Sequence, residues 1–363
     1  VKIGFIPLVD CALLCVAKEK GFAEQEGLDL QLFKEVSWAN IRDKVYLGYL
    51  NGAQMLAGMP LAANLSLMPN STEVYAPFVL GRNGNAITVS HSLYEEMVEF
   101  EGNFLHERAL NIMGRALKAV IKRRKKEGRP QLRFGMVFPF SSHNYHLRYW
   151  MAACDINPDL DVHLAVVPPP LMDQNLAQGY LDGFCVGEPW NSLVVAQDFG
   201  VIIAATAQIW SKSPEKLLGL RKNWAQENKE TVQKLLRSLE KAAKWVENVD
   251  NLKELSVLLS GHTYLDVPAE IIIRALTGEL RLKKGEDFIK IDDFLTLAGK
   301  GVNCPNYNEA SWLIDQMKRW GQIKAGVETG PAIVDAFCQD LYLDALSADN
   351  TEGVSKVRLF DIA

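Results

Sequence analysis

The segment Ser141-Ser142-His143 places two hydroxyls beside an imidazole, directly after an apolar run, Arg133 to Phe138, that predicts a strand. A hydrolase would use such a serine as nucleophile and such a histidine as base. Adjacent residues, however, do not usually direct their side chains at each other, and no acid that would orient the imidazole is identifiable. The alternative is that the hydroxyls, the imidazole and the backbone N–H groups that open the following helix donate hydrogen bonds to an anion.

Two further catalytic motifs begin in the sequence without being completed. Gly299-Lys300-Gly301 starts like a dinucleotide-binding loop, but Cys304 stands where the third glycine is required. His106-Glu107 starts like a zinc-protease helix, but the residue four positions after the histidine is Leu110, and no G-x-S-x-G motif occurs. We therefore predict that the chain is not an enzyme.

Cysteines offer the other route to a chemical site. Cys11 and Cys15 stand four residues apart on one face of a predicted helix and could begin a metal site or a disulfide. No second cysteine or histidine pair with ligand spacing accompanies them. The apolar surroundings of most cysteines predict reduced thiols in the core. The six are Cys11, Cys15, Cys154, Cys185, Cys304 and Cys338. We expect no metal and no cofactor.

The composition is that of a globular protein with more than one domain. The 363 residues indicate two domains, and 48% hydrophobic with 23% charged residues allow a substantial core. The net charge of -5 creates no general attraction for nucleic acid or an anionic membrane. The basic run Lys122 to Lys126 is interpreted as the solvated end of a helix, because the macrodipole favours cations there and no aromatic residues are interleaved.

The sequence also bears on location. No apolar run reaches the roughly 18 residues that span a bilayer, and the chain opens with a strand-like segment, Val1 to Phe5, instead of a signal peptide. We expect a cytoplasmic protein with no membrane insertion. A periplasmic location is the alternative if a signal peptide was removed.

Strands and helices alternate along the first part of the chain. Residues 3–8 predict a strand, Asp10 an N-cap, and Cys11 to Lys20 a helix closed by Gly21. Alternation from Leu28 to Leu32 predicts the next strand. Further strands are predicted at residues 53–57, 74–80 and 86–90, and a helix at 103–126. This order indicates an α/β fold with helices on the faces of a sheet.

A second series of the same kind follows. Strands are predicted at residues 133–138, 162–166 and 183–187, with helices at 144–153 and after Pro170. Residues 201–207 predict another strand, and the remainder is mainly helical, with helices at 228–247 and 308–320.

Seven segments in the first two thirds of the chain share a family resemblance. They are Gly4 to Asp10, Ala17 to Phe22, Ser37 to Asp43, Asn83 to Val89, Leu147 to Trp150, Gly183 to Asn191, and Pro214 to Lys216. In this order they resemble the nitrate/bicarbonate solute-binding family (NrtA/CmpA-like). That family contains nitrate and bicarbonate transport receptors and cytoplasmic nitrate/nitrite sensors.

The resemblance implies a type II periplasmic-binding-protein fold, in which two α/β lobes hold the ligand in the cleft between them. The chain of such a protein crosses between the lobes twice, and we place the crossings near Gly84 and Trp190. Residues 1–84 and 191–363, with the C-terminal helical part, would then form lobe 1, and residues 85–190 would form lobe 2.

The resemblance also implies the ligand contacts. The positions that match the family's oxyanion contacts are Trp38, Asn85, His143, Gly187 and Lys216, with Ser142 as a further candidate. The family usually has glutamine where this chain has Asn85, which shortens the reach of that amide. Taken singly, Asn85 could shape a turn, Trp38 could be a core aromatic, His143 a structural histidine and Lys216 a surface cation.

The chemistry of nitrate agrees with this set of residues. Nitrate is planar, singly charged and a weak acceptor at three oxygens, so its site needs several N–H or O–H donors and about one positive charge. Bicarbonate also carries a hydroxyl donor, which would require a carboxylate acceptor. Lys216 therefore favours nitrate or nitrite, although Glu188 or Glu215 could supply such an acceptor.

Three functions remain open. The resemblance is greatest to the cytoplasmic sensor branch (NasS-like), which implies a protein that sequesters an RNA-binding antitermination regulator of the ANTAR type and releases it when nitrate or nitrite binds. The alternative is the substrate-binding component of a nitrate or bicarbonate ABC transporter, which delivers the anion to an ABC permease. Thiamine-precursor synthases share the general fold, but their cysteine-rich motif and cofactor-bearing histidine have no counterpart here.

Overall fold

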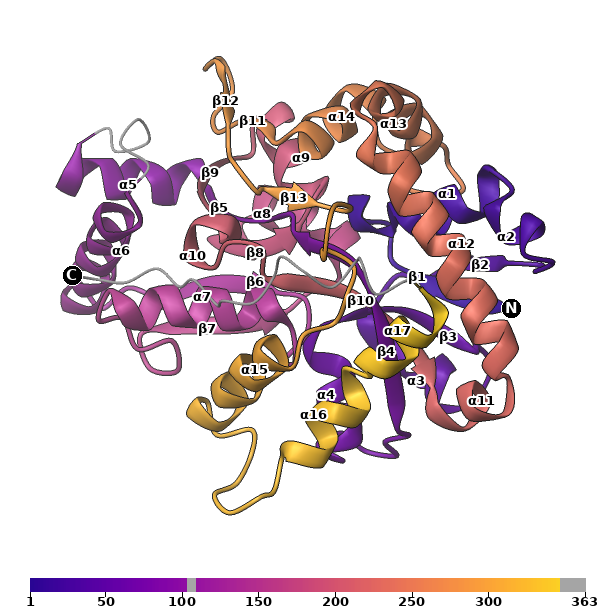
Figure 1. The fold of residues 1–363 in the computed structure, drawn as a ribbon. Coiled ribbons are helices and arrows are strands. Elements are labelled where there is room, and N and C mark those ends of the chain that lie inside the picture. Colours follow the sequence, from indigo (N-terminus) through magenta and orange to yellow (C-terminus); the bar gives the residue numbers. More distant parts are fainter. Residues whose placement is uncertain (103–108, 347–363) are drawn as a thin grey trace.

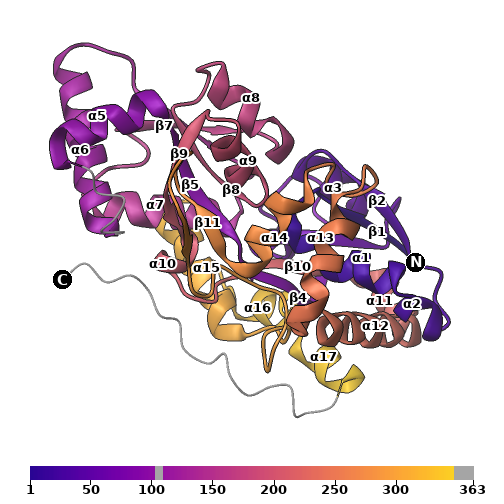
Figure 2. The same cartoon turned by 90° about the horizontal axis from the view of Figure 1, so that it is seen from above.

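Two separate β-sheets organise the chain, and helices pack around each (Figures 1 and 2). The computed structural model describes residues 1–102 and 109–346. One sheet has six strands in the order β13-β4-β10-β3-β1-β2, and the other has five in the order β7-β6-β8-β5-β9. We call the part built on the six-stranded sheet lobe 1 and the part built on the five-stranded sheet lobe 2. The arrangement agrees with the predicted α/β class.

Lobe 1 combines parallel and antiparallel strands. These strands are β1 (Lys2–Phe5), β2 (Gln31–Lys34), β3 (Gly52–Leu56), β4 (Val74–Asn83), β10 (Pro214–Arg221) and β13 (Leu295–Thr296). β1 runs parallel to β2 and β3, whereas β10 is antiparallel to both of its neighbours, β3 and β4. β10 therefore lies inside the sheet although it comes much later in the sequence than the strands beside it.

Most of the C-terminal third packs around lobe 1 as helices. The helices of this lobe are η1 (Val9–Cys11), α1 (Ala12–Glu19), α2 (Phe22–Gln25), α3 (Trp38–Tyr46), α4 (Gly58–Asn64), α11 (Lys222–Glu227), α12 (Lys229–Glu247), η3 (Val249–Asn251), α13 (Leu252–Ser260), α14 (Ala269–Thr277), α15 (Tyr307–Arg319), α16 (Gly330–Ala336) and α17 (Gln339–Ala345). A separate hairpin joins β11 (Glu279–Arg281) to β12 (Phe288–Lys290). The apolar face of α12 is buried, including Leu235 and Leu239, which join the main hydrophobic core.

Lobe 2 is built in the same manner on a smaller sheet. Its strands are β5 (Asn85–Ser90), β6 (Leu132–Met136), β7 (Val162–Val166), β8 (Gly183–Gly187) and β9 (Gly200–Ala205). Its helices are α5 (His91–Glu101), α6 (Leu110–Lys126), α7 (Ser142–Ala153), η2 (Pro169–Leu171), α8 (Met172–Ala177), α9 (Trp190–Ala196) and α10 (Thr206–Ile209). β6 is parallel to β7 and β8, whereas β5 is antiparallel to β8 and β9.

The chain passes from the six-stranded to the five-stranded sheet at Gly84, between β4 and β5. Gly84 has a φ of +83°, and a Cβ atom there would lie 2.8 Å from Leu295 Cδ1, so glycine suits this position on two grounds. The pairing of the strands does not agree with the predicted return of the chain to lobe 1 near Trp190. β9 pairs with β5 in lobe 2, so the chain returns to lobe 1 between Ala205 and Pro214. The division into two domains at these crossings remains a proposal.

Most predicted elements have a counterpart in the structure. The strands at residues 162–166 and 183–187 coincide with β7 and β8. The predicted helix at 103–126 corresponds in part to α6, but residues 103–108, and His106 with them, lie outside the described residues. The N-cap prediction for Asp10 is wrong, because α1 begins after Cys11 and no side chain caps it. The strand β10 was not predicted, because its segment was included in the mainly helical remainder.

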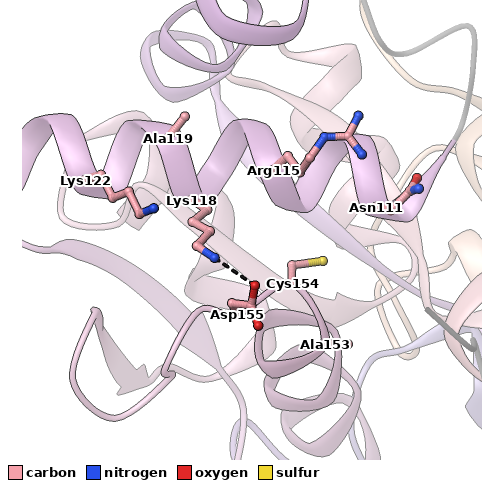
Figure 3. Close-up of a pocket in the computed structure, with 8 residues that line it drawn as sticks. All are labelled: Asn111, Arg115, Lys118, Ala119, Lys122, Ala153, Cys154 and Asp155. Atoms are coloured by element: carbon pink, nitrogen blue, oxygen red, sulfur yellow. Dashed lines mark hydrogen bonds and ion pairs between the residues drawn. The ribbon is translucent and has the colours of Figure 1, made fainter. Parts of the chain in front are cut away.

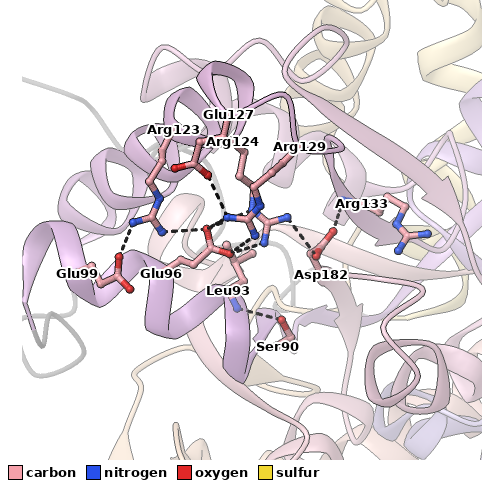
Figure 4. Close-up of polar contacts among 10 residues, drawn as sticks. All are labelled: Ser90, Leu93, Glu96, Glu99, Arg123, Arg124, Glu127, Arg129, Arg133 and Asp182. Carbon is pink, nitrogen blue, oxygen red and sulfur yellow. Dashed lines mark hydrogen bonds and ion pairs between the residues drawn. The ribbon is translucent and has the colours of Figure 1, made fainter.

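The basic run at the end of α6 is only partly solvated. Glu96 of α5 accepts hydrogen bonds from Arg123, Arg124 and Arg129, and Arg123 also contacts Glu99 (Figure 4). The cations attract Glu96 so strongly that they outweigh its burial and lower its pKa to about 2. The interpretation as a helix end holds, but three arginines of this region hold α5 against α6 and do not merely face water.

Candidate functional site

A buried charged pair, Glu215 and Lys216, lies in β10 of lobe 1, and both residues have an exposed fraction of 0%. In a regular strand consecutive side chains point to opposite faces, yet Lys216 Nζ lies 2.9 Å from Glu215 Oε1. The pairing of β10 with β4 shifts register on both sides of Lys216, and an irregularity of this kind re-aims side chains. The local bulge accounts for the meeting of the two charges.

Asp10 supplies a second carboxylate to the same lysine. Its side chain is buried, and Oδ2 lies 2.9 Å from Lys216 Nζ. Its other oxygen, Oδ1, accepts a hydrogen bond of 2.6 Å from Gln54 Nε2. Gln54 is itself held by the backbone N–H of Ile6, which donates to its Oε1 at 2.9 Å. Lobe 1 therefore fixes the ammonium between two carboxylates that come from different elements.

The N-terminus of α7 brings Ser142 and His143 from lobe 2 to this pair. Ser141 caps the helix and accepts a hydrogen bond of 3.1 Å from the backbone N–H of Asn144. Ser142 Oγ donates to Glu215 Oε2, and His143 Nδ1 lies 2.7 Å from Glu215 Oε1. Glu215 is thus a point at which the two lobes meet.

Burial and mutual attraction act in opposite directions on the pKa values of this cluster. Burial would raise the pKa of Glu215, but Lys216 and His143 outweigh it and lower that pKa well below its usual range. Burial would lower the pKa of Lys216, but Asp10 and Glu215 raise it. At Asp10 burial dominates and raises the pKa, and Lys216 offsets only part of this effect. Glu215 and Lys216 are therefore both ionised at neutral pH.

Four polar atoms of predicted site residues are buried without a hydrogen-bond partner in the part of the chain that the structure describes. They are Trp38 Nε1, Asn85 Nδ2, Asn85 Oδ1 and His143 Nε2. The ring of Trp38 also lies against the lysine, with Lys216 Nζ 5.5 Å from the ring centroid. An unsatisfied buried polar atom costs roughly 1–3 kcal/mol, so each of these atoms requires a partner that the described residues do not supply. A small oxyanion is a partner of the right chemistry.

Asn85 and Gly187 face each other across the ladder between β5 and β8. A Cβ atom at Gly187 would lie 3.1 Å from Asn85 Oδ1 and 3.3 Å from Leu8 Cδ2, so a larger residue would crowd both the amide and the segment that leads to Asp10. Both Oδ1 and Nδ2 of Asn85 are unpartnered. The structure brings the predicted residues together in two groups. One is Asn85 with Gly187, and the other is Lys216 with Trp38, Ser142 and His143.

Sequence reasoning missed two of the polar groups that organise this site and underrated a third. Asp10 was assigned to a helix cap, Gln54 was not considered, and Glu215 was considered only as an acceptor for bicarbonate. One signal was available in the sequence. Glu215-Lys216 interrupts an otherwise apolar run, Pro214 to Leu220, and charged residues inside such a run are expected to be paired.

Glu188 is a further buried carboxyl, next to Gly187. Its Oε2 accepts a hydrogen bond of 3.2 Å from the backbone N–H of Ser192, at the start of α9, while Oε1 has no partner. Burial raises the pKa of Glu188 to about 7, and the contacts with Ser192 offset only part of that effect. With Asn85 Oδ1, this carboxyl provides an open acceptor in the neighbourhood of Gly187.

A surface hollow of lobe 2 lies apart from these residues (Figure 3). It has a volume of about 480 Å³ and is lined by residues of α6 and the end of α7, among them Arg115, Lys118, Lys122 and Cys154. Its cations are at least partly exposed, and Lys118 is already paired with Asp155 at 2.9 Å. None of the predicted contacts lines this hollow, so we do not assign the anion to it.

The cysteines are free thiols, and the Sγ atoms of Cys11 and Cys15 lie 3.5 Å apart in the core. Within residues 1–102 and 109–346, no group of three or more His, Cys, Asp or Glu side chains is arranged to hold a metal ion. Over the same residues, no helix combines the length and the apolar character that crossing a bilayer requires.

Comparison with known proteins gives consistent matches. A family model described as the NMT1-like family matches residues 1–260. The chain is 38% identical over 324 residues to the nitrate import ATP-binding protein NrtC of Synechocystis, covering 88% of this chain and 46% of that protein. It is 35% identical over 326 residues to the bicarbonate transport ATP-binding protein CmpC of Synechococcus elongatus, covering 89% of this chain and 45% of that protein. The chain therefore spans less than half the length of these two relatives.

A solved structure extends the comparison to the fold. The crystal structure of the periplasmic nitrate-binding protein NrtA from Synechocystis PCC 6803 matches with a TM-score of 0.86 at 28% identity, covering 95% of this chain and 87% of that chain. This similarity confirms the predicted two-lobed periplasmic-binding-protein fold.

Proposed function

This chain belongs to the NMT1-like family, and from that premise we propose that it binds nitrate or nitrite where its two lobes meet. The observation that carries the proposal is that polar atoms of Trp38, Asn85 and His143 are buried and unpartnered in residues grouped around a buried ammonium and at the end of β8. The proposed ligand contacts are Trp38, Asn85, Ser142, His143, Gly187 and Lys216.

The arrangement of acceptors supports nitrate or nitrite over bicarbonate. The hydroxyl of bicarbonate needs a free carboxylate oxygen. Both oxygens of Glu215 are engaged, by Lys216, His143 and Ser142, and both oxygens of Asp10 are engaged as well. Glu188 Oε1 is an unpartnered carboxyl oxygen that bicarbonate could use, and the amide oxygen Oδ1 of Asn85 is a second unpartnered acceptor. Bicarbonate is therefore the alternative ligand.

The same contacts support a binding role and not catalysis. A serine nucleophile must share a hydrogen bond with the histidine that activates it. Here Ser142 Oγ and His143 Nδ1 each contact a different oxygen of Glu215. The serine is therefore directed at the carboxylate and not at the imidazole, and we propose no hydrolytic activity.

As the biological role we propose a cytoplasmic sensor that holds an antitermination regulator of the ANTAR type and releases it when the anion binds. The anion would stabilise one arrangement of the lobes and change the surface offered to the regulator. The alternative is a role in a nitrate or bicarbonate ABC transporter, either as a periplasmic component or joined to an ATP-binding part. The similarity to NrtC and CmpC favours this alternative specifically.

Isothermal titration with nitrate, nitrite and bicarbonate tests the ligand. We expect nitrate or nitrite to bind to the wild-type protein and to lose most of its affinity in Lys216→Ala, whereas Lys118→Ala, a paired lysine on the surface of lobe 2, should bind as the wild type does. Binding of bicarbonate alone, or nitrate binding that survives Lys216→Ala, would refute the proposed site.

A second measurement distinguishes the sensor from the transporter. If the chain is a sensor, a purified ANTAR-type regulator should bind to it, and nitrate must weaken that complex by the same factor by which the regulator weakens nitrate binding. Independent binding of the two would exclude the sensor mechanism and leave the transport role.

A further inference from the structure

The two ring nitrogens of His143 have different surroundings. Nδ1 lies 2.7 Å from Glu215 Oε1, while Nε2 is buried and has no partner. Because His143 is only 1% exposed, Nε2 is out of contact with bulk solvent. The chemistry that this histidine can offer an anion depends on which of the two nitrogens carries hydrogen.

The contact with Glu215 determines the tautomer. Glu215 is ionised, since Lys216 Nζ lies 2.9 Å away and Ser142 Oγ donates to its second oxygen. An ionised carboxylate only accepts hydrogen bonds, so Nδ1 must be the nitrogen that carries the hydrogen. A neutral imidazole would then have a lone pair at Nε2, and that lone pair would repel the oxygen of an anion. His143 can donate from Nε2 only as an imidazolium.

The charges around the ring lead to the same requirement. Glu215 already balances the ammonium of Lys216, and Asp10 is a second carboxyl on the same lysine, so the cluster with a neutral imidazole has no net positive charge to offer. An added anion would bring an uncompensated negative charge into a buried site, which is strongly unfavourable. A proton on His143 compensates for that charge.

Three neighbouring titratable groups are less well placed to take this proton. His146, one turn further along α7, is held neutral because burial lowers its pKa to about 4. Glu215 of β10 is held ionised by Lys216. Asp10 of η1 has both oxygens engaged, one by Lys216 and one by Gln54. His143 has a free nitrogen, and Glu215 stabilises the positive charge that it would gain.

We propose that His143 binds the anion as an imidazolium, so that one proton enters the site with each anion. This inference rests on the proposed function and adds a second ligand, the proton, to it. The proton is transferred from the buffer to Nε2, no covalent bond to the anion forms, and Glu215 is the positioning residue that sets the requirement. Anion affinity therefore falls as the pH rises.

The test is the titration of nitrate into the full chain in two buffers that differ in ionisation enthalpy, at several pH values. At roughly pH 8 we expect the heats to differ between buffers by the amount that corresponds to about one proton taken up per nitrate. Where one proton is taken up with each nitrate, the affinity should fall about tenfold for each pH unit. If nitrate binds with heats that are independent of the buffer at every pH, the proton inference is overturned but the proposed function is not. The absence of binding in either buffer would remove the proposed function and this inference with it.

Two substitutions separate the proton requirement from a structural role. In Glu215→Gln the side-chain amide can donate to Nδ1, which lets a neutral imidazole keep its hydrogen on Nε2. In His143→Gln an amide donor that does not titrate replaces the ring. For both variants we expect nitrate binding, checked for folding by circular dichroism, with proton uptake reduced from about one to near zero.

The exposed His262, paired with Asp266 on the surface of lobe 1, serves as the control. His262→Gln should take up the same number of protons as the wild type. Proton uptake that persists in both site variants, or that disappears in His262→Gln, would overturn the assignment to His143. If one site variant fails to fold, the other still decides the question.

Discussion

Lys216 remains an ammonium in the core because Asp10 and Glu215 replace the water that it has lost. Isolated buried charges are very costly, and carboxylates at 2.9 Å on two sides compensate for that cost. The compensation also means that the lysine alone does not give the site a net positive charge. The attraction for an anion must then come from directed N–H and O–H donors, and the individual side chains can be tested for it.

Trp38→Phe tests the indole N–H by itself. Phenylalanine keeps an aromatic ring beside Lys216 but removes Nε1, which has no partner in the protein. We expect nitrate affinity to weaken by about 1–3 kcal/mol, because one hydrogen bond to a charged ligand is lost. Stability without anion should stay within about 1 kcal/mol of the wild type. Trp245→Phe, on the distant helix α12, is the matched control for titration and urea unfolding. Unchanged affinity in Trp38→Phe would remove the indole from the site.

Glu188→Gln tests the buried carboxyl beside Gly187. Because burial raises the pKa of Glu188 to about 7, the folded state holds its proton more tightly than the unfolded chain does. The contribution of the protonated carboxyl to the free energy of unfolding is therefore fully present below about pH 4 and is lost as the pH rises to about 7. The variant cannot ionise, so at roughly pH 8 it should be more stable than the wild type by up to about 3 kcal/mol.

Urea unfolding without anion at roughly pH 4 and pH 8 measures this difference. The other ionisable groups are the same in both proteins, so their contributions to the difference in the free energy of unfolding cancel. A difference between variant and wild type that is the same at both pH values would show that Glu188 does not titrate between them.

Among the elements, β10 shows best what could and could not be predicted from the sequence. Local periodicity in the sequence was sufficient to predict β7 and β8, which coincide with the predicted ranges. β10 lies between β3 and β4 and is buried on both faces, so its residues have no polar alternation to mark a strand. Its two partners are distant in sequence, and only the folded sheet reveals the pairing.

The candidate site was predictable to the extent that it resembles a family pattern. Six contact residues were carried over in this way, but the carboxylates of Asp10 and Glu215 were not recognised as partners of Lys216. Asp10 follows a strand and precedes a helix, which is also the pattern of an N-cap. Only the three-dimensional arrangement shows that its oxygens are directed at Gln54 and Lys216 instead.

At the junction of α5 and α6, Glu96→Gln tests the arginine cluster. The arginines lower the pKa of Glu96 to about 2, so the unfolded chain binds this proton more readily than the folded one. The stabilisation is present above the unfolded pKa, about 4.3, and is lost as the pH falls toward about 2. We expect Glu96→Gln to lower the free energy of unfolding by about 2 kcal/mol near neutral pH. This is less than the effect of breaking a fully buried pair, because Arg129 is partly exposed.

Urea unfolding near pH 7 and near pH 3 provides the measurement. Glu99→Gln is the control, since Glu99 is paired with Arg123 and is 60% exposed. A loss of stability in Glu96→Gln that is equally large at both pH values would mean that the carboxylate charge is not what holds the two helices together.

At the scale of the whole molecule, the proposed site draws residues from both lobes, so we expect anything that couples the lobes to change anion affinity as well. α15 is attached to lobe 1 through Glu309, whose Oε1 lies 2.6 Å from Arg82 Nη1 of β4. The segment that follows α15 reaches lobe 2. There Tyr145 Oη donates to Gln322 Oε1 at 2.7 Å, and Gln322 Nε2 donates to the backbone oxygen of Pro139 at 3.1 Å. Gln322 therefore bridges the lobes without touching the anion site.

Gln322→Ala should weaken nitrate binding by about 1 kcal/mol, or roughly fivefold, because the arrangement of lobes that the anion selects loses two hydrogen bonds. Proton uptake on binding should remain as in the wild type, since the chemistry at His143 is unchanged. Gln226→Ala, which removes a hydrogen bond within lobe 1, should leave the affinity unaltered. Calorimetric titration of the three proteins decides the matter. If Gln322→Ala binds nitrate as tightly as the wild type, the bridge is not part of the coupling, and the cross-lobe contacts of Ser142 and His143 with Glu215 must hold the lobes together without it.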